Sequence, residues 1–175
     1  MPTSHGVADA VVRELHDVSE HYGADETRLE SYAAVAAAYA GLLGAFVVAF
    51  RRSNRSLPRA VPAADVVLLG AATFKLSRLL TRAKVTAFIR APFTRYRGPG
   101  APAEVSEEPR GTGAQRAVGE LLACPFCSAQ WLATGLACGY VVNPDAARVV
   151  AAGLAAVVVS DGLQYANAAL QQRYG

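Results

Sequence analysis

The longest uncharged segment of the chain runs from Leu121 to Pro144, and it limits the possible folds more than any other feature. It has 24 residues, contains no Asp, Glu, Lys or Arg, and carries Cys-Pro-Phe-Cys near its start. About 20 apolar residues are enough for a helix to cross a bilayer. A second uncharged run, Ser31–Phe50, is also long enough. The sequence therefore predicts an integral membrane protein.

The composition agrees with this prediction but leaves one alternative open. Hydrophobic residues make up 53% of the 175 residues and charged residues only 18%, whereas soluble domains contain about 25% charged residues. Alanine supplies much of the apolar content, so a soluble Ala-rich helical bundle remains the alternative. The three cysteines lie in or beside apolar sequence, which is not the pattern of an extracellular disulfide framework.

Four apolar helices are expected, at about Leu29–Phe50, Ala63–Leu80, Ala114–Val142 with a break at Pro125, and Ala146–Gln171. The predicted fold class is all-α: a helical integral membrane protein with about four transmembrane helices. An N-terminal amphipathic helix and an interfacial basic helix would complete it.

Three segments follow from the same patterns. Residues 1–30 are acidic, with apolar residues at helical spacing, which predicts an amphipathic arm that packs on its own protein or on the membrane surface. Residues 31–62 hold the first transmembrane helix and a connection. Residues 63–175 form the remaining membrane domain, in which the Gly- and Pro-rich residues 98–113 are expected to be a flexible loop.

A basic stretch without any acid extends from Lys75 to Arg97 and includes Val85, Phe88 and Ile89. Basic and apolar residues together are typical of a helix that lies on anionic lipid headgroups. Nucleic acid is the rival partner, but a basic run beside a spanning helix is better explained by membrane topology, and no nucleic acid is expected. The expected headgroup ligands are Arg82, Lys84, Arg90, Arg95 and Arg97.

The distribution of Arg and Lys predicts the orientation. Four spans with both termini inside place 12 basic residues in the cytoplasm and 5 outside, which satisfies the positive-inside rule. The chain has 15 Arg and only 2 Lys, a bias that suggests a GC-rich bacterial genome. We therefore expect localisation in a bacterial inner membrane with cytoplasmic termini. If the helix from Ala63 were instead re-entrant and the N-terminus outside, the counts would be 14 and 3. Irregular backbone exposed to lipid is costly, which favours four spans.

Asp161 is expected to pair with Lys75 or Arg78. At a rise of 1.5 Å per residue, all three lie at a similar depth on helices that run in the same direction. A charge at that depth needs a partner. The pair either fixes helix register, which we favour, or forms part of a proton or ion relay.

Cys124 and Cys127 have three interpretations. They are packed thiols beside a proline kink, or a thiol–disulfide centre in which one thiolate attacks and the other resolves. The third is a metal site, which needs four ligands and therefore a dimer that supplies the pair twice. The sequence does not decide among these, and no cofactor is identified.

The order ATFKLSRLLTRAKVTAFIRAPF (71–93), then GELLACPFCSAQW (119–131), then a closing apolar helix resembles the domain-of-unknown-function family 1360. This family consists of small bacterial helical membrane proteins, some of them sporulation-associated. The resemblance covers roughly residues 63–170. The family often has Arg where Lys75 stands and Trp where Phe126 stands. It supplies no activity and no catalytic residues.

The expected function is therefore that of a structural or interaction component of the membrane rather than an enzyme. We expect a homo-oligomer or a membrane protein partner. The alternative is a membrane thiol–disulfide oxidoreductase that uses Cys124 and Cys127.

Overall fold

The structure, a computed structural model, describes residues 9–10, 13–14 and 29–174. The predicted amphipathic arm over residues 1–30 lies almost entirely outside these residues.

The described chain is mostly helical, as the sequence predicts. In chain order, the elements are α2 (Leu29–Arg52), α3 (Ala63–Thr81), the 3₁₀ turn η1 (Lys84–Thr86), α4 (Ala87–Arg90), β1 (Thr94–Pro99), β2 (Val105–Pro109), α5 (Gly113–Ala123), α6 (Pro125–Val142) and α7 (Pro144–Tyr174).

Prolines set where three of the long helices begin. Pro62 caps α3, Pro125 occupies the first turn of α6, and Pro144 is the first residue of α7. Proline suits these positions because its fixed φ fits a helix and its missing N–H would have no partner there. Pro125 also separates α5 from α6, whose axes differ by 82°. The predicted break in the third helix is therefore confirmed.

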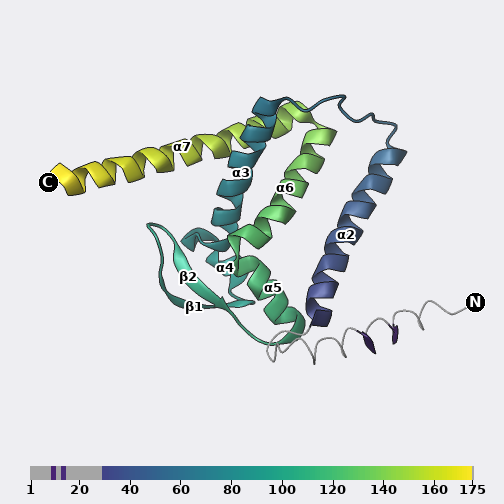
Figure 1. Cartoon of the computed structure of the whole chain (residues 1–175), viewed down its shortest axis with the longest axis horizontal. Coiled ribbons are helices and arrows are strands. Elements are labelled where there is room, and N and C mark those ends of the chain that lie inside the picture. Colours follow the sequence, from purple (N-terminus) through teal and green to yellow (C-terminus); the bar gives the residue numbers. More distant parts are fainter. Residues whose placement is uncertain (1–8, 11–12, 15–28, 175) are drawn as a thin grey trace, which may run out of the picture.

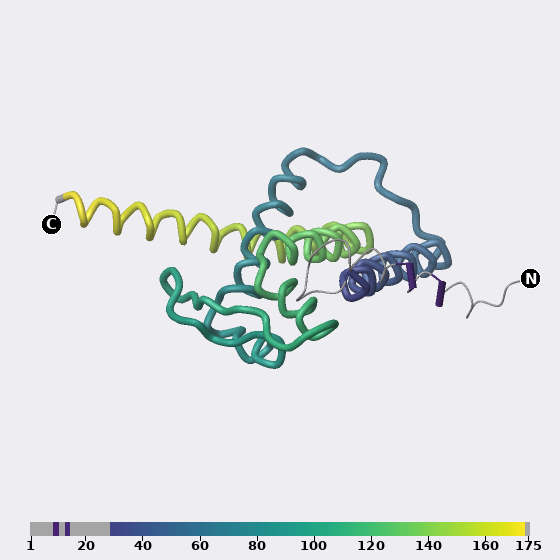
Figure 2. Tube along the Cα trace, turned by 60° about the horizontal axis from the view of Figure 1, so that its bottom comes forward, coloured from purple at the N-terminus to yellow at the C-terminus, as the bar shows by residue number. Residues whose placement is uncertain are grey.

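Helix α3 is central, because it packs against both α6 and α7. The connection from α2 to α3 and the turn from α6 to α7 lie at one end of the bundle, and the strands with α5 lie at the other (Figure 1). Helix α7 leaves the bundle, and its C-terminal half projects beyond the other helices (Figure 2). All residues of this half, 162–173, are exposed.

The prediction of an all-α fold is wrong in one region. Residues 94–99 and 105–109 form an antiparallel hairpin, and Gly98 and Ser106 are partners beside an irregularity in its register. Most of the expected flexible loop over residues 98–113 is therefore ordered strand and turn. The expected interfacial helix is also absent, because the chain after α3 forms only the short turns η1 and α4 before Pro92. Pro92 has no backbone N–H, so it cannot continue the helical hydrogen bonding beyond α4.

Two helices, Leu29–Arg52 and Pro144–Arg173, are long and apolar enough to cross a membrane. The bent pair α5–α6 passes the same test if it is taken as one span. Helix α3 has the length of a span, but it carries three charges, at Asp65, Lys75 and Arg78. The surroundings of these charges decide how α3 is interpreted.

We predict that Gly119→Ala destabilises the protein. An added Cβ would overlap the carbonyl oxygen of Phe93 and approach Pro109 to 3.2 Å. In an open helix the same change stabilises by up to about 1 kcal/mol, whereas overpacking costs about 1–3 kcal/mol, so the clash decides the sign. Thermal unfolding in detergent micelles measures the effect. Gly98→Ala is the control, because nothing lies within 4 Å of its added Cβ. An unchanged midpoint for Gly119→Ala would contradict the close approach of α5 to the hairpin.

Candidate functional site

Lys75 and Asp161 form an ion pair between α3 and α7. Lys75 Nζ donates to Asp161 Oδ2 over 2.6 Å, and the side chains are 21% and 39% exposed. The sequence predicts that Asp161 pairs with Lys75 or with Arg78, and the structure has the pair with Lys75. Because the two residues are 86 positions apart in the chain, their pairing fixes how α7 crosses α3.

Arg78 does not join this pair. Its guanidinium instead binds Glu104, with Nη2 at 2.7 Å from each carboxylate oxygen and Nε at 3.0 Å from Oε1. Glu104 lies just before β2, where Ala83 and Glu104 form an isolated bridge. The second charge of α3 therefore holds the hairpin to the end of the helix.

The third charge of α3 lies in a cluster that the sequence analysis did not predict. The Tyr140 hydroxyl donates to Asp65 Oδ2 over 2.5 Å, and Arg148 binds both carboxylate oxygens, at 2.8 and 3.1 Å. Asp65 and Tyr140 are buried. Asp65 belongs to α3, Tyr140 to α6 and Arg148 to α7. This cluster joins three helices at the end opposite the hairpin.

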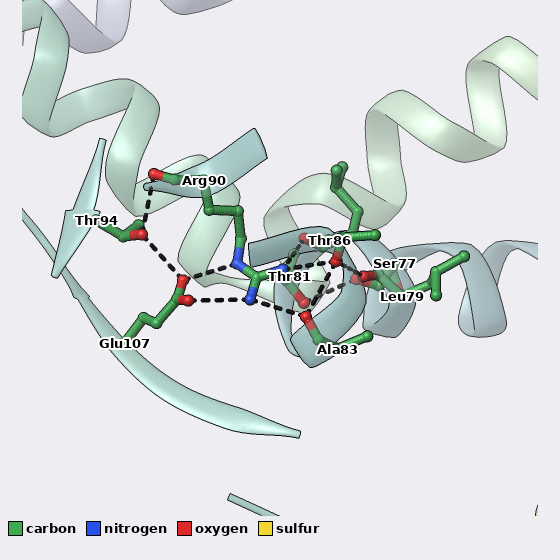
Figure 3. Close-up of polar contacts among 9 residues, drawn as sticks. Ser77, Leu79, Thr81, Ala83, Thr86, Arg90, Thr94 and Glu107 are labelled. Carbon is green, nitrogen blue, oxygen red and sulfur yellow. Dashed lines mark hydrogen bonds and ion pairs between the residues drawn. The ribbon is translucent and has the colours of Figure 1, made fainter. Parts of the chain in front are cut away.

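Arg90 is the most buried large side chain of the described residues, at 0% exposure. Its guanidinium binds both oxygens of Glu107 at 2.7 and 3.1 Å. It also donates to the carbonyl oxygens of Leu80 and Ala83 and to the Thr86 hydroxyl, at 2.7–3.1 Å. Figure 3 shows this group joining the end of α3, the turn that follows it and β2.

Glu107 is held ionised by these contacts. Burial alone would raise the pKa of its carboxyl group, but the hydrogen bonds from Arg90 and Thr94 outweigh burial and lower it. The Thr94 hydroxyl donates to Glu107 over 2.9 Å. No buried side-chain nitrogen or oxygen in the described part of the chain lacks a partner. Such full pairing is what a charged group needs when it is withdrawn from water.

These contacts correct the predicted headgroup ligands. Arg90 is completely enclosed by protein, so the prediction that it binds lipid is wrong. Arg97 forms an ion pair with Glu108. Arg82, Lys84 and Arg95 form no ion pair within residues 29–174. The three acids of the hairpin region thus pair with Arg78, Arg90 and Arg97 and leave three cations of the basic stretch Lys75–Arg97 without an ion pair.

Cys124 and Cys127 lie in contact at the bend between α5 and α6. Cys124 is the N-cap residue of α6, and its sulfur accepts a hydrogen bond from the Cys127 N–H over 3.2 Å. Cys127 is exposed, and Phe126 between them is 88% exposed. A helix N-terminus and an N–H donor both stabilise a thiolate, so this arrangement is chemically suited to thiol exchange.

The structure does not bring other metal-binding side chains to this pair. Among the described residues, no group of three or more His, Cys, Asp or Glu is placed to hold a metal ion. Cys138 lies farther along α6, in an apolar groove between α2 and α6 that Tyr39 and Trp131 also line. Across this groove, Tyr39 contacts the Thr134 hydroxyl at 2.6 Å and accepts from the Gln130 amide.

A sequence signal for the Arg90 group was present. Glu104, Glu107 and Glu108 follow an acid-free basic stretch, and the two blocks are separated by Gly-Pro-Gly-Ala-Pro. Opposite charges on either side of a turn indicate a hairpin whose strands neutralise each other. Asp65, Tyr140 and Arg148 gave no comparable local signal.

The comparisons place this chain in a family without an assigned activity. Residues 68–167, more than half of the chain, match the family described as "Protein of unknown function (DUF1360)". The chain belongs to this family. No curated protein and no solved structure matches it. The region that matches DUF1360 contains most of α3, the hairpin, α5, α6 and most of α7, whereas α2 and the first turn of α3, with Asp65, precede it.

We predict that Asp161→Leu destabilises the folded protein by about 2–3 kcal/mol if α3 and α7 lie in the bilayer as expected, because it leaves Lys75 without its anion. Adding Lys75→Leu should recover part of this loss. Arg78→Leu in the same background is the matched control and should not, because Arg78 is held by Glu104. Unfolding midpoints in micelles measure all three. Equal recovery by Arg78→Leu would contradict the pairing.

Proposed function

We propose that this DUF1360 protein is a structural or interaction component of a bacterial inner membrane. In this proposal α2, α3, α6 and α7 span the bilayer, and the hairpin, α5 and both termini are cytoplasmic. The observation that carries it is the pairing of every charge on α3 with a partner from another element. Asp65 is bound by Arg148, Lys75 by Asp161 and Arg78 by Glu104.

This pairing removes the objection to α3 as a span. An isolated charge in the bilayer is costly, but a charge that faces the bundle and is paired is tolerated. At 1.5 Å per residue, the 19 residues of α3 extend over about 28 Å, close to the hydrocarbon thickness of about 30 Å. The charges at its two ends also lie near the two membrane surfaces.

The arrangement of the connections supports the orientation. The α2–α3 connection and the α6–α7 turn lie together at the end opposite the hairpin (Figure 1). Arg55 also donates to the Val142 carbonyl oxygen over 2.6 Å, which ties these two connections to each other. If this end is outside, 12 basic residues lie on the cytoplasmic side and 5 lie outside, as the positive-inside rule requires.

An interaction role is supported by how little of α2 and α7 the protein itself covers. In the most apolar 18-residue windows of these helices, 0% and 6% of the residues are buried. Lipid covers such faces in a monomer, and helices of a partner or of a second copy cover them in an assembly. A homo-oligomer or a membrane protein complex is therefore the assembly we propose.

A second candidate function is thiol–disulfide exchange, and the N-cap position of Cys124 favours it. In this reaction the Cys124 thiolate attacks a partner disulfide and one partner sulfur leaves as a thiolate. Cys127 then displaces the second partner sulfur, so two thiols are oxidised while one disulfide is reduced. Pro125 and the Cys127 N–H fix the first sulfur at the helix start.

We predict that the hairpin faces the cytoplasm. A cysteine at Ser106, in a variant whose three native cysteines are serine, should react with a membrane-impermeant maleimide in inverted vesicles and not in intact cells. Reporter fusions at the two termini should give the same side. Labelling of Ser106→Cys in intact cells would overturn the proposed orientation.

We predict that, if the second candidate is correct, Cys124 and Cys127 form a reversible intramolecular disulfide in a glutathione redox buffer. A maleimide polymer should then attach to all three cysteines of the reduced protein and only to Cys138 of the oxidised protein. Cys138→Ser is the control that should keep this redox response, and Cys124→Ser should abolish it. Continued labelling of all three cysteines under oxidising conditions would exclude the redox function without affecting the membrane proposal.

A further inference from the structure

The turns that follow α3 expose three adjacent apolar side chains. Val85, Phe88 and Ile89 are 73%, 75% and 44% exposed. Their spacing of three and four residues places them on one side of the η1–α4 turns. Single exposed apolar residues are ordinary, whereas contiguous exposed apolar patches are candidate interaction surfaces. We refer to these three residues as the apolar ridge.

The apolar ridge cannot turn inward, because Arg90 occupies the inner side of the same segment. Arg90 is completely buried and is bound by Glu107, by the carbonyl oxygens of Leu80 and Ala83, and by the Thr86 hydroxyl. Rotating the segment would break these contacts and leave a buried charge unpaired, which is strongly unfavourable. The exposure of the ridge is therefore built into the fold.

The ridge is also tethered close to the end of α3. Val85 is only four positions after Thr81, the last residue of α3. An extended chain of four residues spans at most about 14 Å. If α3 ends at the cytoplasmic membrane surface, as proposed above, the ridge is within reach of the lipid headgroups.

Unmatched cations flank the ridge. Lys84 immediately precedes Val85, and Arg82 and Arg95 lie on either side of the segment in the chain. None of the three forms an ion pair with the described residues, and the hairpin acids pair with Arg78, Arg90 and Arg97. The charge of Arg82 is nevertheless close enough to Glu107 to help lower the pKa of that carboxyl group. Apolar groups bordered by free cations complement a leaflet of anionic phospholipid.

We propose that the apolar ridge inserts between the headgroups of the cytoplasmic leaflet, with Arg82, Lys84 and Arg95 facing anionic phospholipid. This inference rests on the proposed topology and adds a specific lipid contact to it. The Arg90–Glu107 pair then couples the hairpin to the membrane surface, because it fixes both the ridge and β2. The hairpin becomes a surface-bound platform rather than a freely moving loop.

Tryptophan fluorescence tests the contact, because Trp131 is the only tryptophan of the chain. The protein is placed in vesicles of phosphatidylethanolamine and phosphatidylglycerol that contain lipid brominated near the headgroup end of its chains. Phe88→Trp, with Trp131→Phe, reports on the ridge. Tyr96→Trp in the same background is the control, since Tyr96 is an exposed aromatic residue of β1 outside the ridge. If Trp131→Phe does not fold, Phe88→Trp and Tyr96→Trp are made in the native chain, and the quenching of native Trp131 is subtracted from the quenching of each variant.

We expect bromine to quench Phe88→Trp about twofold or more above Tyr96→Trp, and replacing phosphatidylglycerol by phosphatidylcholine to reduce this difference. Native Trp131, quenched by lipid brominated deeper in the chain, reports separately on whether α6 is embedded. Quenching of Trp131 with no excess for Phe88→Trp would overturn the lipid contact and leave the topology intact. Absence of quenching at both positions would overturn the proposed topology itself. An excess independent of phosphatidylglycerol would overturn the role of the three cations.

Discussion

The arrangement of the helices depends on one constraint: every charge on α3 is paired with a charged side chain from another part of the chain. Asp65, Lys75 and Arg78 lie along the length of α3, and their partners come from α7 and from the hairpin. Small changes in helix register would break these contacts, since each has specific geometry. The pairs do not need to add net stability, because buried ion pairs often only balance their desolvation cost. Their effect is to select one packing of α3 against α7 and the hairpin.

A second consequence concerns the segment between α3 and α5. Arg90 is charged and completely buried, so the chain around it has to supply acceptors from several directions. Glu107 does this from β2, and the end of α3 and the turn after it supply two backbone carbonyl oxygens. The basic stretch is therefore divided into bases that build the hairpin region and bases that remain available at the surface. This division determines which basic residues are available for the proposed lipid contact.

The sequence predicted the long helices well and the region between them poorly. Apolar runs bounded by Pro and charged residues determine α2, α3, α6 and α7 locally, and the break at Pro125 is a local backbone effect. The hairpin depends on pairing between Arg90 and Glu107, 17 residues apart, which no periodicity of a single segment reveals. The expected depth of Lys75 and Asp161 in the membrane, counted along their helices, is enough to predict that they lie near each other. By contrast, the contact between Tyr140 and Asp65 needs the relative rotation of α3 and α6, which depth does not give.

If α3 crosses the bilayer with its charges paired, its two ends lie on opposite sides of the membrane, and chemical labelling distinguishes the two sides. Ala60 precedes α3 and Ala101 lies in the hairpin connection, and both are exposed. In a variant whose native cysteines are serine, Ala60→Cys and Ala101→Cys are each treated with a membrane-impermeant maleimide in intact spheroplasts and in inverted vesicles. We expect labelling of Ala60→Cys only in spheroplasts and of Ala101→Cys only in inverted vesicles. Labelling of both positions from the same side would show that α3 does not span the membrane and would contradict the proposed topology.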